Sequence, residues 1–180
     1  MQDAGAYPAI GSVLPMFGRI MASGNYAFDR VDASGESVVT NTTPIGAYRG
    51  AGRPEATLAV ERIIDVYAAE IGMDPAELRR KNFIGKDDFP YKTQTGADMD
   101  TGDYEAALDK VLDVVDVDAL RADQASRIDD PSKPLLGIGW AAYVEITNPL
   151  GASEFGSCEI RPDGTALLLT GSSAHGQGHY

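Results

Sequence analysis

The 180-residue sequence predicts an α+β protein in which mixed sheets pack with helices. Three observations support this class: apolar residues recur at helical spacing in the middle of the chain, helix-start signals are strong, and the residues after Pro134 have the apolar runs and turns of strands. These changes of character divide the chain into residues 1–130 and residues 131–180. The second part is predicted to be a β-hairpin segment that leads into a glycine-rich loop. We expect neither part to be a complete, independent domain.

The N-terminal stretch is predicted to contain one short helix and two strands. Residues 13–21 are mostly apolar and form the helix candidate. The stretch YAFDRVDASGESVVTNT then predicts two strands on either side of Ser34 and Gly35.

A long helix is predicted to begin at Pro54, because proline is tolerated at the first helical position, where its missing N–H costs nothing. Gly72 is expected to end it. One face of this helix is apolar, so we expect it to pack against the rest of the protein. That face consists of Ala56, Ala59, Val60, Ile63, Tyr67 and Ile71.

A second helix is predicted directly afterwards in DPAELRRKN, with Asp74 as N-cap, Pro75 in the first turn and Glu77 completing a capping box. Two more helices are predicted in the acidic region, DYEAALDKVLDVV and VDALRADQASRI. Acidic clusters can bind cations, but carboxylates at helix starts and on solvent-facing surfaces are the commoner arrangement. We therefore interpret these acidic residues as structural.

Strands are predicted for the rest of the chain. LLGIGWAAYVEI is a nearly continuous apolar run, and FGSCEIRPDGTALLLTGS is predicted to form a hairpin that turns at Pro162, Asp163 and Gly164.

Composition excludes several classes of function. The hydrophobic content of 43% argues against disorder, and the net charge of -12 argues against binding to nucleic acid or to an anionic membrane. The apolar runs are too short to span a bilayer, so we expect no membrane insertion. Cys158 is the single cysteine, and no secretory leader is recognisable, so a cytoplasmic location is expected.

The stretch IGAYRGAGRPEA, residues 45–56, is the first candidate site. Its glycines allow positive φ or close backbone approach, and it runs directly into the helix that begins at Pro54. Backbone N–H groups at a helix start, with Arg49 and Arg53 beside them, could cradle an anionic ligand. The pattern is neither a dinucleotide fingerprint nor a P-loop, and a tight turn into a helix remains the simpler alternative.

The stretch SSAHGQGHY, residues 172–180, is the second candidate site. Gly176 and Gly178 flank the amide of Gln177, which can both donate and accept hydrogen bonds. Together the two glycine-rich loops suggest halves of one binding site. His175 and His179 have a spacing that zinc accepts on a helix, but the glycines disfavour a helix there and no third ligand is evident.

These motifs resemble those of the molybdenum-binding large subunit of the xanthine dehydrogenase, aldehyde oxidase and aerobic carbon monoxide dehydrogenase family. The resemblance lies in GAYRGAGRPEA and GSSAHGQGH, and it extends to the flanking DAGAYP, VVTNTTP, EIGMDPAELRRKNFI and FGSCEIRPDGT. It implies a molybdopterin-binding region that starts within residues 1–130 and continues to the cofactor loop near residue 180. It also implies molybdenum held by a molybdopterin, often in its cytosine dinucleotide form, and hydroxylation of a carbon atom with oxygen from water. Electrons would leave through 2Fe-2S clusters and FAD on other domains or on iron–sulfur and flavin partner subunits.

The resemblance also assigns roles to individual residues. It implies that the backbone around Arg49 and Gly50 contacts the ligands of the metal, and that Tyr48 and Ala51 border a small-molecule substrate. It assigns Gly176, Gln177 and Gly178 to the cofactor, and it implies no direct ligation of the metal by a side chain.

Two departures from the family pattern bear on the substrate. Alanine at position 51 replaces the phenylalanine that stacks on a purine in xanthine dehydrogenases, which argues against a purine substrate. Glycine at position 50 replaces the cysteine that binds copper in carbon monoxide dehydrogenases, which argues against carbon monoxide oxidation.

The upstream molybdopterin loop and the downstream catalytic glutamate of the family are not recognisable in these residues. Glu55, Glu145 and Glu154 lie outside the motif of that base, so we interpret them as structural and expect no catalytic residue here. The sequence therefore predicts an internal piece of a molybdenum hydroxylase large subunit that is inactive alone. A non-catalytic small-ligand or subunit-docking module and a remnant without function are the alternatives.

Overall fold

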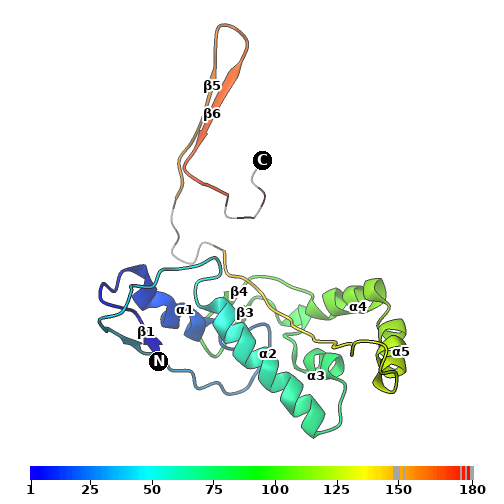
Figure 1. Cartoon of the computed structure of the whole chain (residues 1–180). Coiled ribbons are helices and arrows are strands. Elements are labelled where there is room, and N and C mark those ends of the chain that lie inside the picture. Colours follow the sequence, from blue (N-terminus) through cyan, green and yellow to red (C-terminus); the bar gives the residue numbers. More distant parts are fainter. Residues whose placement is uncertain (148–150, 152, 175, 177, 179–180) are drawn as a thin grey trace. The chain divides into compact units, whose positions relative to one another are not determined.

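The computed structural model describes residues 1–147, 151, 153–174, 176 and 178. They belong to two compact units, Met1–Val144 and Glu145–Tyr180, which we call the N-terminal and C-terminal units and describe separately. The described residues form helices together with small two-stranded sheets (Figure 1). The predicted α+β class is therefore confirmed.

The N-terminal unit begins with a small parallel sheet and a short helix. Strand β1, Gln2–Asp3, pairs with β2, Ser37–Val38. Between them lie the 3-10 helix η1, Ile10–Val13, and helix α1, Leu14–Ile20, which confirm the helix predicted over residues 13–21.

The prediction of two strands around Ser34 and Gly35 is only half right. The second strand is present as β2, but it pairs with the N-terminus of the chain. The first strand is missing, and Tyr26 instead makes an isolated bridge to Phe83. The reason is that the Tyr26 side chain is buried in the core, where its hydroxyl has a partner on another helix.

Helix α2, Arg53–Glu70, is the long helix predicted to start at Pro54. Gly72, with a φ of +66°, follows its end as expected. The predicted buried face was wrong in part: Ala56 and Val60 are half-buried, but Ala59, Ile63, Tyr67 and Ile71 are exposed. The buried residues of α2 are Glu61, Ile64 and Ala68, and pattern reading missed this face because it contains a glutamate.

Helix α3, Pro75–Asn82, starts at the predicted cap. The Asp74 carboxylate accepts hydrogen bonds from the N–H groups of Ala76 and Glu77, at 2.8 and 3.1 Å. The Glu77 side chain pairs with Arg80 on its own helix at 3.1 Å. The cap is therefore confirmed, and the side chain of Glu77 has a different partner from the one predicted.

The core of the N-terminal unit lies between α2 and α3. Tyr26, Ile64, Ala68 and Leu78 are buried together, and Phe28, Val60, Met73 and Phe83 pack against them. The rings of Tyr26 and Phe83 stack with centroids 5.5 Å apart. Burying each of the larger side chains stabilises the fold by about 1.5–3 kcal/mol.

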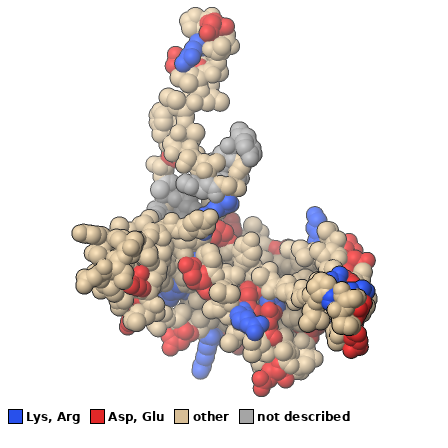
Figure 2. Space-filling view, in the orientation of Figure 1, with Lys and Arg blue, Asp and Glu red and all other residues tan. Residues whose placement is uncertain are grey.

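A small hairpin and two helices follow α3. The 3-10 helix η2, Lys86–Asp88, leads into strands β3, Tyr91–Lys92, and β4, Asp98–Met99, which pair antiparallel and were not predicted. Helices α4, Tyr104–Val115, and α5, Val117–Ile128, confirm the two acidic helices. On the face in Figure 2, acidic side chains are spread among Lys and Arg, as expected for a solvated surface.

Residues 135–144 are extended but do not form a paired strand, which corrects the prediction for LLGIGWAAYVEI. In Figure 1 this segment leaves α5 and runs back past α3 and α2. Its side chains alternate regularly between half-buried at even positions and exposed at odd positions. The segment has strand geometry, but no neighbouring strand lies beside it among the described residues of the N-terminal unit.

In the C-terminal unit, β5, Gly156–Ile160, and β6, Ala166–Thr170, form the predicted hairpin. Gly164 has a φ of +84° at the turn, and its N–H donates to the Arg161 carbonyl at 3.0 Å. Among the described residues, the structure contains no helix that is long and apolar enough to cross a membrane.

Candidate functional site

The N-terminal strand positions the candidate site. It forms backbone hydrogen bonds with the segment that precedes the 45–56 loop. The N–H groups of Gln2, Ala4 and Ala6 donate to the carbonyl groups of Glu36, Val38 and Thr42, at 2.8 to 3.0 Å. The DAGAYP and VVTNTTP motifs therefore form one backbone ladder.

The side chain of Asp3 adds further hydrogen bonds to this ladder. Its carboxylate accepts hydrogen bonds from the N–H of Gly5 at 2.8 Å and from the hydroxyls of Thr40 and Thr42 at 2.7 and 3.1 Å. The bonds from Gly5 and Thr40 lower the pKa of Asp3 below its ordinary value of 3.8. Gly5 is required here, because a Cβ would lie 2.5 Å from the carbonyl oxygen of Thr43.

Three consecutive residues of the loop have positive φ. Gly50, Ala51 and Gly52 have φ values of +102°, +44° and +90°. A Cβ at Gly52 would also collide with the carbonyl oxygen of Leu14 at the start of α1. The loop is therefore pressed against α1 with a backbone shape that side chains larger than glycine disfavour.

This shape leaves backbone donors without acceptors. The N–H groups of Ala51 and Arg53 donate to the carbonyl groups of Tyr48 and Gly50, at 2.8 and 3.1 Å. The N–H groups of Gly50, Gly52 and Glu55, however, have no hydrogen-bond partner among the described residues. Glu55 lies in the first turn of α2, where unpaired N–H groups and the helix dipole favour an anion.

A pocket of about 300 Å³ lies on this loop. Of the residues predicted for the site, Tyr48, Arg49 and Ala51 line it, whereas Gly50 does not. The Tyr48 side chain is 89% exposed. The pocket is also lined by other residues of the predicted 45–56 loop, namely Ile45, Gly46, Gly52, Pro54 and Glu55, and by two residues that the sequence did not single out, Gln2 and Leu14.

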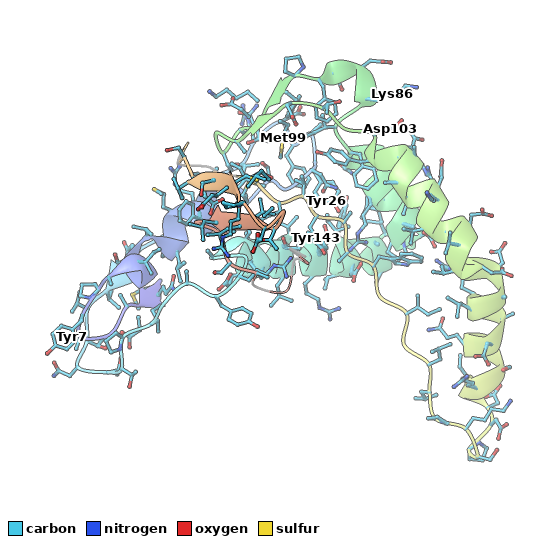
Figure 3. All side chains as sticks on the ribbon, turned by 90° about the horizontal axis from the view of Figure 1, so that it is seen from above. Tyr7, Tyr26, Lys86, Met99, Asp103 and Tyr143 are labelled. Atoms are coloured by element: carbon cyan, nitrogen blue, oxygen red, sulfur yellow. The ribbon has the colours of Figure 1, made fainter. Side chains whose placement is uncertain are left out.

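A buried polar network supports the helix that carries the loop. Glu61 on α2 accepts a hydrogen bond from the Tyr26 hydroxyl at 2.5 Å and one from Arg79 Nε at 2.7 Å. Arg79 also donates to the carbonyl groups of Glu61 and Trp140, and the Ala142 N–H donates to Glu61 at 2.9 Å. Figure 3 shows Tyr26 beside α2 and Tyr143 on the segment that crosses this helix.

The surroundings of Tyr26 and Arg79 raise the pKa values of both residues. Burial and the Glu61 carboxylate raise the pKa of Tyr26 well above its ordinary value, so its hydroxyl remains a donor. Burial acts to lower the pKa of Arg79, but the bonds to Glu61 and Asp65 outweigh it. The sequence analysis did not identify this network. The signal that could have indicated it was a glutamate on the apolar side of a helical pattern.

The second glycine-rich loop belongs to the C-terminal unit. Gly176 and Gly178 have φ values of +91° and +80°, which suits glycine. Gln177, His175 and His179 lie outside the described residues. Because the two units are described separately, the prediction that both loops hold one ligand stays a prediction.

The carboxylates that we interpreted as structural lie in different places. Glu55 is on the wall of the pocket, and Glu154 lies beside Gly171 in the C-terminal unit. No group of three or more His, Cys, Asp and Glu side chains that could hold a metal occurs among the described residues.

The chain is similar to known molybdenum proteins. Residues 1–83 match the family described as "Molybdopterin cofactor-binding domain". The carbon monoxide dehydrogenase large chain of Hydrogenophaga pseudoflava is 46% identical over 88% of this chain and 21% of its own length. The large chain of the same name from Afipia carboxidovorans is 34% identical over 99% of this chain and 24% of its own length.

A solved structure of a related enzyme is also similar to this chain. Quinoline 2-oxidoreductase from Pseudomonas putida 86 matches with a TM-score of 0.83 and 30% identity, over 98% of this chain and 24% of that chain. The 180 residues thus span between a fifth and a quarter of the length of these relatives. The molybdopterin-binding motifs, the sequence relatives and the fold together support a fragment of a molybdenum-binding large subunit, of the family that includes carbon monoxide and xanthine dehydrogenases.

Proposed function

We propose that this chain is a piece of a molybdenum hydroxylase large subunit, and that residues 45–56 and 176–178 help to hold its molybdopterin. The observation that carries the proposal is the set of N–H groups at Gly50, Gly52 and Glu55 that find no hydrogen-bond partner among the described residues. Two of these residues line a pocket of about 300 Å³. Such donors at a helix start suit the anionic atoms of a phosphorylated or thiolate-bearing cofactor.

The residues of the pocket divide into two roles. The backbone around Arg49 and Gly50 is assigned to the cofactor, together with Gly176, Gln177 and Gly178. Tyr48 and Ala51 are assigned to the substrate, because an exposed ring and a small side chain leave room at the pocket wall. When bound, the molybdenum cofactor supplies the two-electron oxidation, and the residues described here contribute binding and orientation.

We infer that the substrate of the intact subunit is an aldehyde or an N-heterocycle, hydroxylated with water as the oxygen source. The likeness to quinoline 2-oxidoreductase supports an N-heterocycle. Carbon monoxide is disfavoured in spite of the sequence relatives, because Gly50 has no side chain that could bind copper.

The remaining assignments extend this proposal. The cofactor would be in its cytosine dinucleotide form, and iron–sulfur and flavin subunits in the cytoplasm would accept the electrons. Residues 1–130 would form the first part of the molybdopterin-binding region and residues 131–180 the hairpin segment leading to the second cofactor loop. The chain would be catalytically inactive alone, because no residue in it is assigned as the base.

The test compares this chain with the full-length subunit in a host that makes the cofactor. We expect the full-length subunit, purified with its partners, to contain stoichiometric molybdenum and to reduce a dye with an aldehyde or an N-heterocycle. The 180-residue chain should contain little molybdenum and reduce no dye. Elemental analysis, mass spectrometry of the extracted cofactor and dye reduction measure these outcomes.

Two results would change the conclusion. A full-length subunit without molybdenum would contradict the proposed function and favour a non-catalytic binding module. Turnover by the 180 residues alone would require a base among them, and Glu145 and Glu154 would be the first carboxylates to replace.

A further inference from the structure

The turn that leads into α2 has a strained backbone. Gly50, Ala51 and Gly52 have φ values of +102°, +44° and +90°, and a residue with a side chain, such as Ala51, rarely adopts a positive φ. A strained backbone persists only where the surrounding structure fixes it. The contacts that fix this turn therefore determine where its N–H groups point.

Helix α1 provides the surface on which the turn is fixed. A Cβ added at Gly52 would lie 2.3 Å from the Leu14 carbonyl oxygen, and one added at Gly18 would lie 3.0 Å from the Gly52 carbonyl oxygen. The backbones of α1 and the turn are thus in close contact, which a side chain at Gly52 would prevent. Helix α1 also contacts α2, beside which it lies in Figure 1.

Side chains add a further contact between α1 and the turn. The guanidinium carbon of Arg53 lies over the Phe17 ring, 5.4 Å from its centre, which is within the range of attraction between a cation and an aromatic face. Arg53 is the first residue of α2, and its N–H donates to the Gly50 carbonyl at 3.1 Å. Both side chains are half-buried, so water screens the attraction only in part.

The start of a helix is an unusual place for a cation. It carries partial positive charge, which favours an anion and disfavours the charge of Arg53. The Phe17 ring offsets part of this cost by receiving the guanidinium at its face. An aliphatic side chain in place of Phe17 would remain apolar but would not attract the charge.

We propose that Phe17 and Arg53 are positioning residues for the cofactor loop. The ring holds the guanidinium, and the guanidinium fixes the first turn of α2 against α1. The N–H groups of Gly50, Gly52 and Glu55 are thereby held in one orientation. This inference rests on the proposed function, which assigns these N–H groups to the molybdopterin. Neither Phe17 nor Arg53 lines the pocket of about 300 Å³, so both act through the backbone of the loop.

Hydrogen exchange in the 180-residue chain, followed by NMR, tests the effect on the loop without any cofactor. The probe is the Arg53 N–H, because its bond to Gly50 closes the turn. We expect Phe17→Leu to speed its exchange about fivefold, and Phe17→Tyr, which keeps an aromatic face, to leave the rate near that of the parent. The Leu78 N–H, which donates to the Asp74 carbonyl, is the internal control and should not change.

The molybdenum content of the full-length subunit tests the effect on the cofactor. Phe17→Leu and Arg53→Met both remove the attraction between ring and charge, and each should lower the molybdenum retained after gel filtration about twofold or more. The double variant should lose no more than Arg53→Met alone, because both changes remove the same interaction. Phe17→Tyr should retain molybdenum like the parent. Circular dichroism ensures that all variants are compared in the folded state.

The proposal is overturned if Phe17→Leu leaves both the exchange of the Arg53 N–H and the molybdenum content at the parent values, or if Phe17→Tyr fails to restore them. Equal acceleration at Arg53 and Leu78 would show a general loss of stability and would overturn it as well. A parent subunit without molybdenum contradicts the proposed function instead. Exchange in the free chain then still decides whether Phe17 holds the turn.

Discussion

Glu61 and Arg79 form a buried ion pair, with Oε2 and Nε 2.7 Å apart and side chains only 7% and 1% exposed. Replacing Glu61 by alanine leaves the guanidinium buried without its main partner and removes the acceptor of the Tyr26 hydroxyl. We expect Glu61→Ala to lower the free energy of unfolding by about 3–5 kcal/mol. Urea denaturation followed by circular dichroism measures this change.

The matched control is Glu77→Ala, which removes a carboxylate from Arg80 on the surface of α3. This pair is partly exposed, so its loss should cost less than about 1 kcal/mol. Equal effects of the two substitutions would contradict the structural role of the buried pair.

The buried face of α2 predicts different effects for two adjacent isoleucines. Ile64 is 7% exposed and belongs to the core, whereas Ile63 is 65% exposed. We expect Ile64→Ala to cost about 2–5 kcal/mol and Ile63→Ala less than about 0.5 kcal/mol. Denaturation of both variants in the 180-residue chain checks the assignment, and a larger loss for Ile63→Ala would restore the face predicted from the sequence.

Gly52 is expected to be intolerant of a side chain. Its φ of +90° disfavours alanine by about 1–2 kcal/mol, and a Cβ would collide with the Leu14 carbonyl. Gly52→Ala should therefore lower the thermal midpoint of the chain and the molybdenum content of the full-length subunit. Gly137→Ala is the control, since a Cβ at Gly137 meets no atom within 4 Å and this residue does not line the pocket. If both variants keep the metal equally well, the shape of the loop does not matter for the cofactor.

Asp3 is expected to titrate below its ordinary value of 3.8, because the Gly5 N–H and the Thr40 hydroxyl stabilise its charged form. A folded-state pKa that is lowered contributes stability above the ordinary value and loses it as the pH falls through the folded-state value. NMR of the side-chain carboxyl carbon measures this titration. Thr40→Val should move the pKa back toward 3.8, and a midpoint at or above 3.8 in the parent chain would show that these bonds do not form in solution.

Ala51 offers a test of the substrate pocket in an active holoenzyme. Ala51→Phe should raise KM for bulky aldehydes and N-heterocycles more than for small ones, because the ring narrows the pocket. Ala51→Gly should leave this dependence on size nearly unchanged, and it suits the φ of +44° at this position. Rates are compared at equal molybdenum content. Identical kinetics of Ala51→Phe and the parent enzyme across the size series would remove Ala51 from the pocket wall.

The sequence predicted correctly those helix ends and turns that are marked by characteristic residues nearby. Asp74 and Pro75 marked the start of α3, and the residues around Gly164 marked the hairpin turn, because both features depend on nearby backbone geometry. Tyr48, Arg49 and Ala51 do line a common pocket, because its walls come largely from one continuous loop, while the roles assigned to these residues stay predictions.

Features that depend on distant residues could not be predicted in this way. The burial of Glu61 depends on Arg79, and the place of Tyr26 depends on both, so periodicity alone predicted the buried face of α2 only in part. The run after Pro134 has the composition of a paired strand, but pairing requires a neighbour that no local pattern specifies. The short hairpin of β3 and β4 was missed because each strand has only two residues.

The bonds of Glu61 and Arg79 also imply an order of events during folding. These two residues are 18 positions apart, whereas Arg79 reaches Trp140 across 61 positions and Glu61 reaches Ala142 across 81. Contacts between distant positions close larger loops and form more slowly. We expect α2 and α3 to pair first, so that in a chain synthesised from its N-terminus the later segment meets a surface already in place. Its docking is then the last step of folding and the first to be lost in unfolding.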